Sequence, residues 1–267
     1  GTAGQWKSIM MGWSYENGLA IPPFGEGGTF TGGLSRLLKV GFIANVAKFD
    51  YNSLYPSIIL TWGISDKKDL MGVMLKFLEY VLSGREKYKG LTKKAKKEAE
   101  RIKEKIANKP DDVTIEELEA LLRDFEKEES ANDKKQLPLK IFGNSFFGSY
   151  GAPNVFNWAS IDCAERTTCT GRMALRLMIY QFNALGYQPI VGDTDGFNFK
   201  LPDTYRYTDE NPYISNGMSR VTEAGKKYTG FQADVAEFND KFMRDFHYGP
   251  NCVNKMGLGI DEIVAAT

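Results

Sequence analysis

Residues 49–59 read FDYNSLYPSII, and this stretch decides how the rest of the chain is interpreted. Residues 45–49, which lead into this stretch, predict a short strand ending at Asp50. Pro56, near the start of an apolar run, predicts a helix or helical turn over residues 53–60. An acidic side chain is thus expected at the open end of a strand, beside the free N–H groups of a tight turn. This arrangement suits the binding of a polyphosphate. When this stretch is considered alone, an Asp that only caps a short helix explains it equally well.

Two further stretches carry polar residues in patterns that indicate chemistry. Residues 140–148 read KIFGNSFFG, in which Lys140 and Asn144 share one face of a helix. Residues 192–196 read GDTDG between two strand-like segments, which predicts a hairpin with two carboxylates at its tip. Such carboxylates repel each other unless a cation lies between them. Taken singly, a solvated lysine and an ordinary β-turn are the simpler explanations, and a glycosyltransferase-type Asp-x-Asp is a weak rival.

Composition limits the class of protein. The chain has 267 residues, 42% hydrophobic and 25% charged, which is typical of a soluble globular protein and excludes a largely disordered one. No apolar run approaches the roughly 20 residues of a membrane span. Three cysteines and a single histidine, His247, argue against a disulfide framework, a zinc site or a Ser-His-Asp triad. Metal chemistry would therefore depend on carboxylates, which favour Mg²⁺ or Mn²⁺.

The middle of the chain predicts two helices of opposite charge. Residues 84–105 hold ten Lys or Arg against four Glu, on a helix expected over 66–108. Residues 111–130 hold nine acidic residues and two basic ones, on a helix that a capping box at Thr114 and Glu117 begins. The pattern predicts an antiparallel helical hairpin whose flanks attract each other. The lysine run is either a solvated face or a face that meets phosphates.

The remaining segments carry weaker signals. Residues 1–45 are rich in glycine and predict loops and turns, whereas residues 134–150 and 160–185 predict further helices. A helix is also expected around 217–228, followed by a mixed stretch to 247. Cys163 and Cys169 are expected to be packing residues. Helices and antiparallel strands together predict an α+β fold.

The three motifs together, D-x-x-S-L-Y-P-S-I-I, K-x-x-x-N-S-x-x-G and G-D-T-D in that order, resemble the polymerase core of family-B DNA polymerases, and most of all those of phages and prophages. The resemblance implies an antiparallel palm sheet with packed helices and a helical-hairpin fingers subdomain. Residues 1–65, with the Gly-rich segment, form the first part of the palm, 66–148 the fingers, and 149–267 the second part of the palm, truncated before the thumb. We expect a piece of a longer protein whose exonuclease and thumb domains are missing here.

The resemblance also implies a reaction, template-directed transfer of deoxynucleotides from a dNTP to a primer 3′-OH by two Mg²⁺ ions, with Mn²⁺ as a substitute. The implied catalytic residues are Asp50, Asp195 and Lys140. The metal group is Asp50, Tyr51, Asp193 and Asp195. The nucleotide-binding residues are Ser53, Leu54, Tyr55, Arg85, Lys89, Lys140 and Asn144, with Tyr55 as the steric gate against ribose. The DNA-binding residues are Gly32, Gly33, Phe147 and Gly148.

The implied partners are primer–template DNA, dNTPs and a sliding clamp, with no membrane, in the cytoplasm of a bacterial host. Two alternatives stay open at this point. The chain could be an inactive DNA-binding relic of a polymerase, although both Asp50 and Asp195 are retained. It could also be a protein-primed polymerase, which Asn52 favours and the long helical hairpin disfavours.

Overall fold

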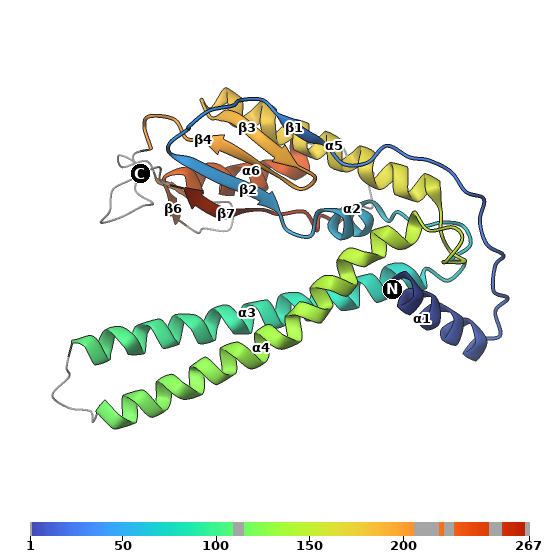
Figure 1. The fold of residues 1–267 in the computed structure, drawn as a ribbon, viewed down its shortest axis with the longest axis horizontal. Helices are drawn as coiled ribbons and strands as arrows, with labels where there is room; N and C mark the ends of the chain where they lie inside the picture. Colours follow the sequence, from blue (N-terminus) through green and yellow to red (C-terminus); the bar gives the residue numbers. More distant parts are fainter. Residues whose placement is uncertain (1, 109–114, 206–218, 222–226, 246–252, 265–267) are drawn as a thin grey trace.

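The computed structural model describes residues 2–108, 115–205, 219–221, 227–245 and 253–264. The fold is α+β, as predicted: a sheet backed by helices, from which a long helical hairpin projects (Figure 1). Its elements in chain order are α1 (Thr2–Glu16), β1 (Ser35–Leu37), β2 (Val46–Tyr51), α2 (Leu54–Trp62), α3 (Val73–Ala107), α4 (Ile115–Tyr150), α5 (Ile161–Ala184), β3 (Gln188–Asp193), β4 (Gly196–Lys200), β5 (Ser219–Val221), β6 (Lys227–Thr229), α6 (Phe231–Asp245) and β7 (Leu258–Val264). Among these described helices, none is both long and apolar enough to cross a membrane.

The main sheet has the order β1-β3-β4-β2-β7, and every neighbouring pair is antiparallel. Side chains alternate between the faces of a strand. On β2, Phe49 and Tyr51 are buried against helices: the Phe49 ring lies 4.7 Å from that of Phe182 on α5, and the Tyr51 ring 6.3 Å from that of Phe238 on α6. Lys48 and Asp50 alternate with these core residues, so they belong to the opposite face of the sheet, where the candidate site lies.

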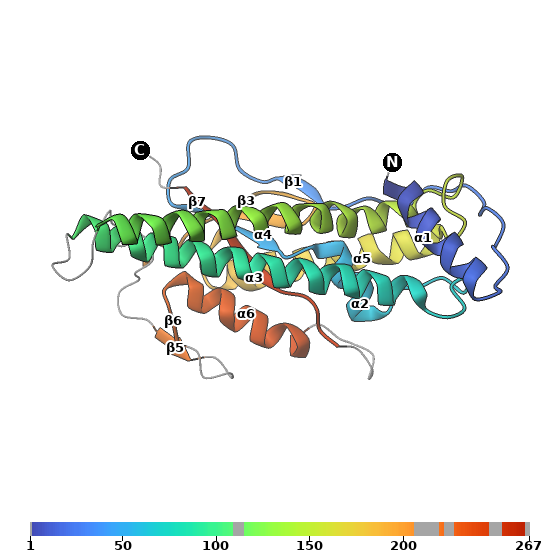
Figure 2. The same cartoon turned by 90° about the horizontal axis from the view of Figure 1, so that it is seen from below.

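The predicted hairpin is present, and α3 and α4 run side by side along their length (Figure 2). The buried positions along the hairpin are separated by intervals close to whole helical turns, from three residues to fourteen, so each helix keeps one face toward its partner. They include Val81, Ala95, Ala99 and Ile102 on α3 and Leu118, Asn132, Gly143 and Phe146 on α4. The basic and acidic helices are joined by an ion pair of 2.9 Å between Lys103 and Glu126.

The helical limits differ from the prediction at two places. α3 begins at Val73 rather than at 66, because the Asp69 carboxylate accepts hydrogen bonds from the backbone N–H groups of Val73 and Met74, both at 2.9 Å. α4 continues from Ile115 through Pro138, so residues 134–150 are not a separate helix. Proline removes one helical hydrogen bond, and the contacts of α4 with α3 on either side of Pro138 hold the helix together. Thr114 of the predicted capping box lies outside the described residues.

The prediction of loops throughout residues 1–45 is wrong for the first turns of the chain, which form α1. Trp6 of this helix stacks on Phe142 of α4 with ring centroids 4.1 Å apart, and its indole Nε1 donates to the Phe142 carbonyl at 3.3 Å. Packing on α4 therefore stabilises a helix whose own apolar periodicity is weak. Residues 17–45 do lack helix, as expected, and contain β1.

The prediction of a helix around 217–228 is also wrong for the residues that the structure describes there, since β5 and β6 pair antiparallel. Such short strands depend on their partners and carry little periodicity of their own. The mixed stretch that follows contains α6, whose buried Phe231, Val235, Phe238 and Phe242 cover the sheet. Cys163 is buried as expected, but Cys169 is exposed and is not a packing residue. His247 lies outside the described residues.

Candidate active site

Strand pairing brings the first and third motifs together. Asp50 on β2 is paired with Gly196 on β4, and the backbone N–H of Tyr51 donates to the carbonyl of Asp195 at 2.9 Å. A Cβ atom at Gly196 would lie 2.7 Å from the Phe49 carbonyl oxygen, so only glycine permits this close approach. In the turn that joins β3 to β4, Thr194 adopts the left-handed conformation with φ of 60°. The turn thus places the Asp195 carboxylate beside the end of β2.

The two carboxylates share an environment that disfavours their charge. Burial raises the pKa of Asp50 to about 6, and repulsion by Asp195 adds to the effect. Burial also raises the pKa of Asp195, which Lys48 opposes. The Oδ1 atom of Asp50 is buried without a hydrogen-bond partner. A buried carboxylate oxygen without a donor is costly unless a cation meets it, so these residues fit a hard divalent cation.

Tyr51 and Asp193, the other predicted metal residues, are in different environments from Asp50 and Asp195. Tyr51 is buried, and its hydroxyl donates to the Ala174 carbonyl at 3.1 Å, so only its backbone is available to an ion. The Asp193 side chain is exposed and accepts a hydrogen bond of 3.1 Å from Thr194. Within the described parts of the chain, no group of three acidic, His or Cys side chains is close enough to complete a metal site. Backbone carbonyls, water or substrate phosphates would supply the remaining ligands.

A cavity of about 370 Å³ lies over the carboxylates, between the sheet and the helical hairpin. Asp50 and Asp195 line it on one side, and all the predicted nucleotide-binding residues line it as well. These are Ser53, Leu54 and Tyr55 from the start of α2, Arg85 and Lys89 from α3, and Lys140 and Asn144 from α4. Cations from the hairpin and carboxylates from the sheet therefore line one cavity.

The cations of α3 contact the turn after β2. Arg85 donates to the hydroxyl of Ser53, and the Lys89 ammonium lies 3.4 Å from the Asn52 side-chain oxygen. Ser53 holds a left-handed conformation with φ of 48°, which is strained for a residue other than glycine. Burial lowers the pKa of Lys89, and the charges of Arg85, Lys93 and Lys140 lower it further. This cluster of like charges is arranged to receive an anion.

The Tyr55 ring is held in one position. It packs on Phe147 of α4 with ring centroids 4.3 Å apart. A Cβ atom at Gly33 would lie 2.7 Å from the Tyr55 hydroxyl, and one at Gly171 would lie 3.2 Å from the ring. Two of the predicted DNA-binding residues, Gly33 and Phe147, thus meet at Tyr55, and a third, Gly148, is exposed on α4 beside Phe147.

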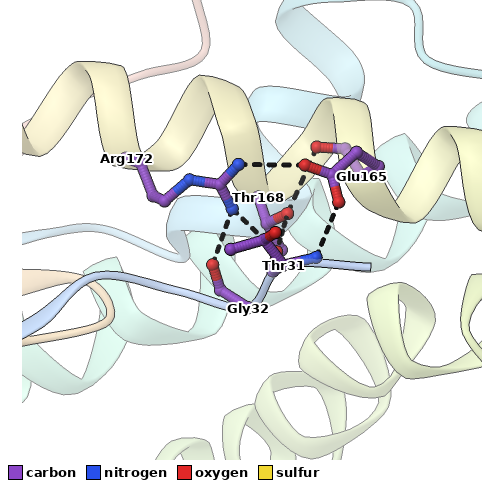
Figure 3. A network of polar contacts seen from close by, with 5 residues as sticks. All are labelled: Thr31, Gly32, Glu165, Thr168 and Arg172. Carbon is purple, nitrogen blue, oxygen red and sulfur yellow. Dashed lines mark hydrogen bonds and ion pairs between the residues drawn. The ribbon is translucent and has the colours of Figure 1, made fainter. Parts of the chain in front are cut away.

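The segment that carries Gly32 and Gly33 is fastened to α5 by a polar network that the sequence did not reveal (Figure 3). Arg172 donates to the carbonyls of Thr31 and Gly32, both at 2.7 Å, and forms an ion pair of 3.0 Å with Glu165. Glu165 accepts from the Thr31 N–H at 2.7 Å, and Thr168 donates to the Thr31 carbonyl at 2.6 Å. An extended segment without regular structure is thereby given a defined path past Tyr55.

Sequence reasoning also missed the ion pair beside the carboxylates, in which the Lys48 ammonium lies 2.7 Å from Asp261. Lys48 could have been found, because it lies two residues before Asp50 on the same face of a strand. Asp261 lines the cavity and is the extra residue at a register shift between β7 and β2, opposite Lys48 and Phe49. Only the pairing of distant strands reveals it.

Acidification is expected to stabilise the metal-free chain through Asp50. Its pKa is raised from 3.8 to about 6 on folding, so between these values the folded state holds a proton that the unfolded state releases. This contribution is fully present below the lower value and is lost as the pH rises through the higher one. Thermal unfolding in EDTA from about pH 4 to about pH 8 checks this against Asp50→Asn. The variant should become the more stable protein as the pH rises, and a constant difference in Tm would contradict the assignment.

Comparison with known proteins finds DNA polymerases that are similar to this chain in sequence. The chain is 26% identical over 231 residues to a DNA polymerase of Desulfurococcus sp. (strain Tok), which covers 76% of this chain and 26% of that protein. It is 28% identical over 197 residues to a DNA polymerase of Thermococcus sp. (strain 9oN-7), covering 66% and 22%, and 24% identical over 243 residues to DNA polymerase 2 of Aeropyrum pernix, covering 78% and 27%. No family model matches the chain. The chain thus has homologues among archaeal DNA polymerases, and spans about a quarter of their length.

Proposed function

We propose that this chain is the palm and fingers of a family-B DNA polymerase, which adds deoxynucleotides to a primer 3′-OH on a DNA template. The observation that carries the proposal is the cavity in which Asp50 and Asp195 face the cations of the hairpin. Residues 1–65 and 149–267 form the palm in this proposal, and residues 66–148 the fingers. The homologous DNA polymerases support it.

The residues that line the cavity have two roles in this proposal, which are metal binding and triphosphate binding. Asp50 and Asp195 would hold two divalent cations, Mg²⁺ or Mn²⁺, with the Tyr51 carbonyl beside them and Asp193 outside the direct contacts. When bound, such ions lower the pKa of the primer hydroxyl and neutralise charge on the triphosphate. Arg85, Lys89 and Asn144 bind and orient the triphosphate. Ser53, which is hydrogen-bonded to Arg85, and the first N–H groups of α2 do the same.

The reaction joins the primer 3′-oxygen to the α-phosphorus of the dNTP and breaks the bond from that phosphorus to the departing pyrophosphate. The hydroxyl proton passes to solvent. Lys140, which lines the cavity, would give a proton to the leaving oxygen, and the other cations would stabilise its charge. Tyr55, held by Phe147, closes the space below the sugar. Closure of the α3–α4 hairpin would bring Arg85, Lys89 and Lys140 onto the nucleotide.

The partners in this proposal are primer–template DNA, which Gly32, Gly33, Phe147 and Gly148 would contact, and dNTPs. Exonuclease and thumb domains in the parent protein and a sliding clamp are further partners that the resemblance implies. A phage or prophage origin and action in the bacterial cytoplasm remain predictions from the motifs alone.

Primer extension tests the proposal. The chain is incubated with a recessed DNA duplex, dNTPs and Mg²⁺, and Asp195→Ala is the control. We expect extension that the variant abolishes. A second assay measures dNTP binding with and without Mg²⁺, because a chain can bind dNTP yet hold DNA too weakly to turn over. Absence of both extension and metal-dependent dNTP binding would contradict the proposal and favour an inactive relic.

A further inference from the structure

A second cavity adjoins the candidate active site and has no role in the reaction described above. It has a volume of about 580 Å³. Four residues, Asn52, Ser53, Arg85 and Lys89, line both cavities, so they form the partition between them. Beyond this partition, the second cavity is bounded by Lys93 and Glu86 of α3 and by the segment 254–257 before β7.

The walls of this second cavity carry an excess of positive charge. Arg85, Lys89 and Lys93 are spaced four residues apart on α3, so they follow one another along one face of the helix. Lys255 faces them from the segment before β7, where it forms an ion pair of 2.9 Å with Glu79. Among the described residues of the lining, the one carboxylate is that of the exposed Glu86. No ion pair joins Arg85, Lys89 or Lys93 to a described carboxylate, and the Arg85 Nε atom is buried without a partner.

The lining also limits the kind of anion that fits. Its other members are hydroxyl, amide, glycine and aliphatic residues, namely Ser57, Asn254, Gly90, Gly257, Leu82 and Met256. None of the described residues of this lining is aromatic, so these residues offer no ring on which a base could stack. Successive cations on α3 are about 6 Å apart along the helix axis, a spacing that one diphosphate can bridge. The wall therefore suits a compact polyphosphate that carries no nucleoside.

We propose that this second cavity binds inorganic pyrophosphate, the product of the proposed reaction, after it crosses the partition formed by Arg85 and Lys89. The inference rests on the proposed function for the source of the pyrophosphate, but the binding itself does not require turnover. Lys93 receives the anion on the far side of the partition. Lys89 lines both cavities, and its contact with Asn52 is long, at 3.4 Å, and therefore weak. Its ammonium group can thus follow the anion from one cavity to the other.

Calorimetric titration of the chain with inorganic pyrophosphate in EDTA tests the site, because the absence of metal removes binding through Asp50 and Asp195. Lys93→Ala is expected to weaken the binding by about 3- to 10-fold, the effect of one charge-assisted contact at a partly exposed site. Lys94→Ala is the matched control. It removes the same charge from the neighbouring exposed residue, which does not line the cavity, and should change the affinity by less than about twofold. Circular dichroism establishes that both variants are folded.

Three results would overturn the inference. Equal weakening by Lys93→Ala and Lys94→Ala would show a general charge effect. Weakening by Lys140→Ala but not by Lys93→Ala would place pyrophosphate in the catalytic cavity alone. Loss of primer–template affinity in Lys93→Ala, with pyrophosphate binding unchanged, would assign the cavity to DNA. Binding that depends on Lys93 in a chain that neither extends primers nor binds dNTP in the presence of Mg²⁺ would support the site while contradicting the proposed function.

Discussion

Asp50→Asn is expected to reduce primer extension by more than about a thousandfold, since it removes a carboxylate that would hold the catalytic cations. The same change should leave the fold intact and raise the free energy of unfolding of the metal-free chain at neutral pH by on the order of 1 kcal/mol. The ionised Asp50 is half-buried beside Asp195, and its Oδ1 lacks a partner, so the folded state gains when that charge is lost. A loss of activity caused by unfolding would change stability in the opposite direction.

Single-turnover extension and thermal denaturation measure the two effects on the same samples. Asp203→Asn is the control, because it removes one carboxylate from an exposed position outside the cavity. Extension at the parent rate by Asp50→Asn would refute the metal assignment. Reduced stability with lost activity would show that Asp50 acts mainly in folding.

Tyr55→Ala is expected to admit ribonucleotides. Its ring is confined by Phe147, Gly33 and Gly171, so it cannot move aside for a 2′-hydroxyl. Removing the ring should lower the preference for dNTP over rNTP, expressed as the ratio of kcat/KM values, by about 10- to 200-fold, the range that a single steric contact supplies.

Tyr55→Phe separates the steric role from other roles of the hydroxyl. It keeps the ring and its packing on Phe147, so discrimination against ribonucleotides should stay near that of the parent chain. Steady-state incorporation of single dNTPs and rNTPs measures both variants. An unchanged sugar preference in Tyr55→Ala, or an equal loss in both variants, would contradict the steric-gate assignment.

The sequence pattern predicted the structure correctly where residues close together in the chain determine the conformation. The strand before Asp50, the helix begun by Ser53, the turn around Thr194 and the paired charge runs of the hairpin were all predicted, and the structure has them. These features depend on residues close together in sequence, namely proline at a helix start, glycine in tight turns and apolar residues at helical spacing. The order of the three motifs added the resemblance to a polymerase family, which no single motif carried.

Prediction failed where the partner of a segment decides its conformation. α1 depends on the stacking of Trp6 on Phe142, which lies 136 residues away. The strands β5 and β6, predicted as one helix, are short and gain stability from each other. Glu165 and Thr168 gave no signal in the sequence, because their role is to bind the backbone of a segment far from them in the chain.

Residue type and short-range spacing were sufficient to predict the class of fold, the candidate carboxylates and the cations of the hairpin. The strand pairing shows how Asp50 and Asp195, which the resemblance puts in one metal group, come together. The positions of Asp261 at a strand register shift and of Lys93 in a second cavity could be found from the three-dimensional structure alone. Distances between residues far apart in the chain depend on strand order and helix packing, which form only when the whole core is buried.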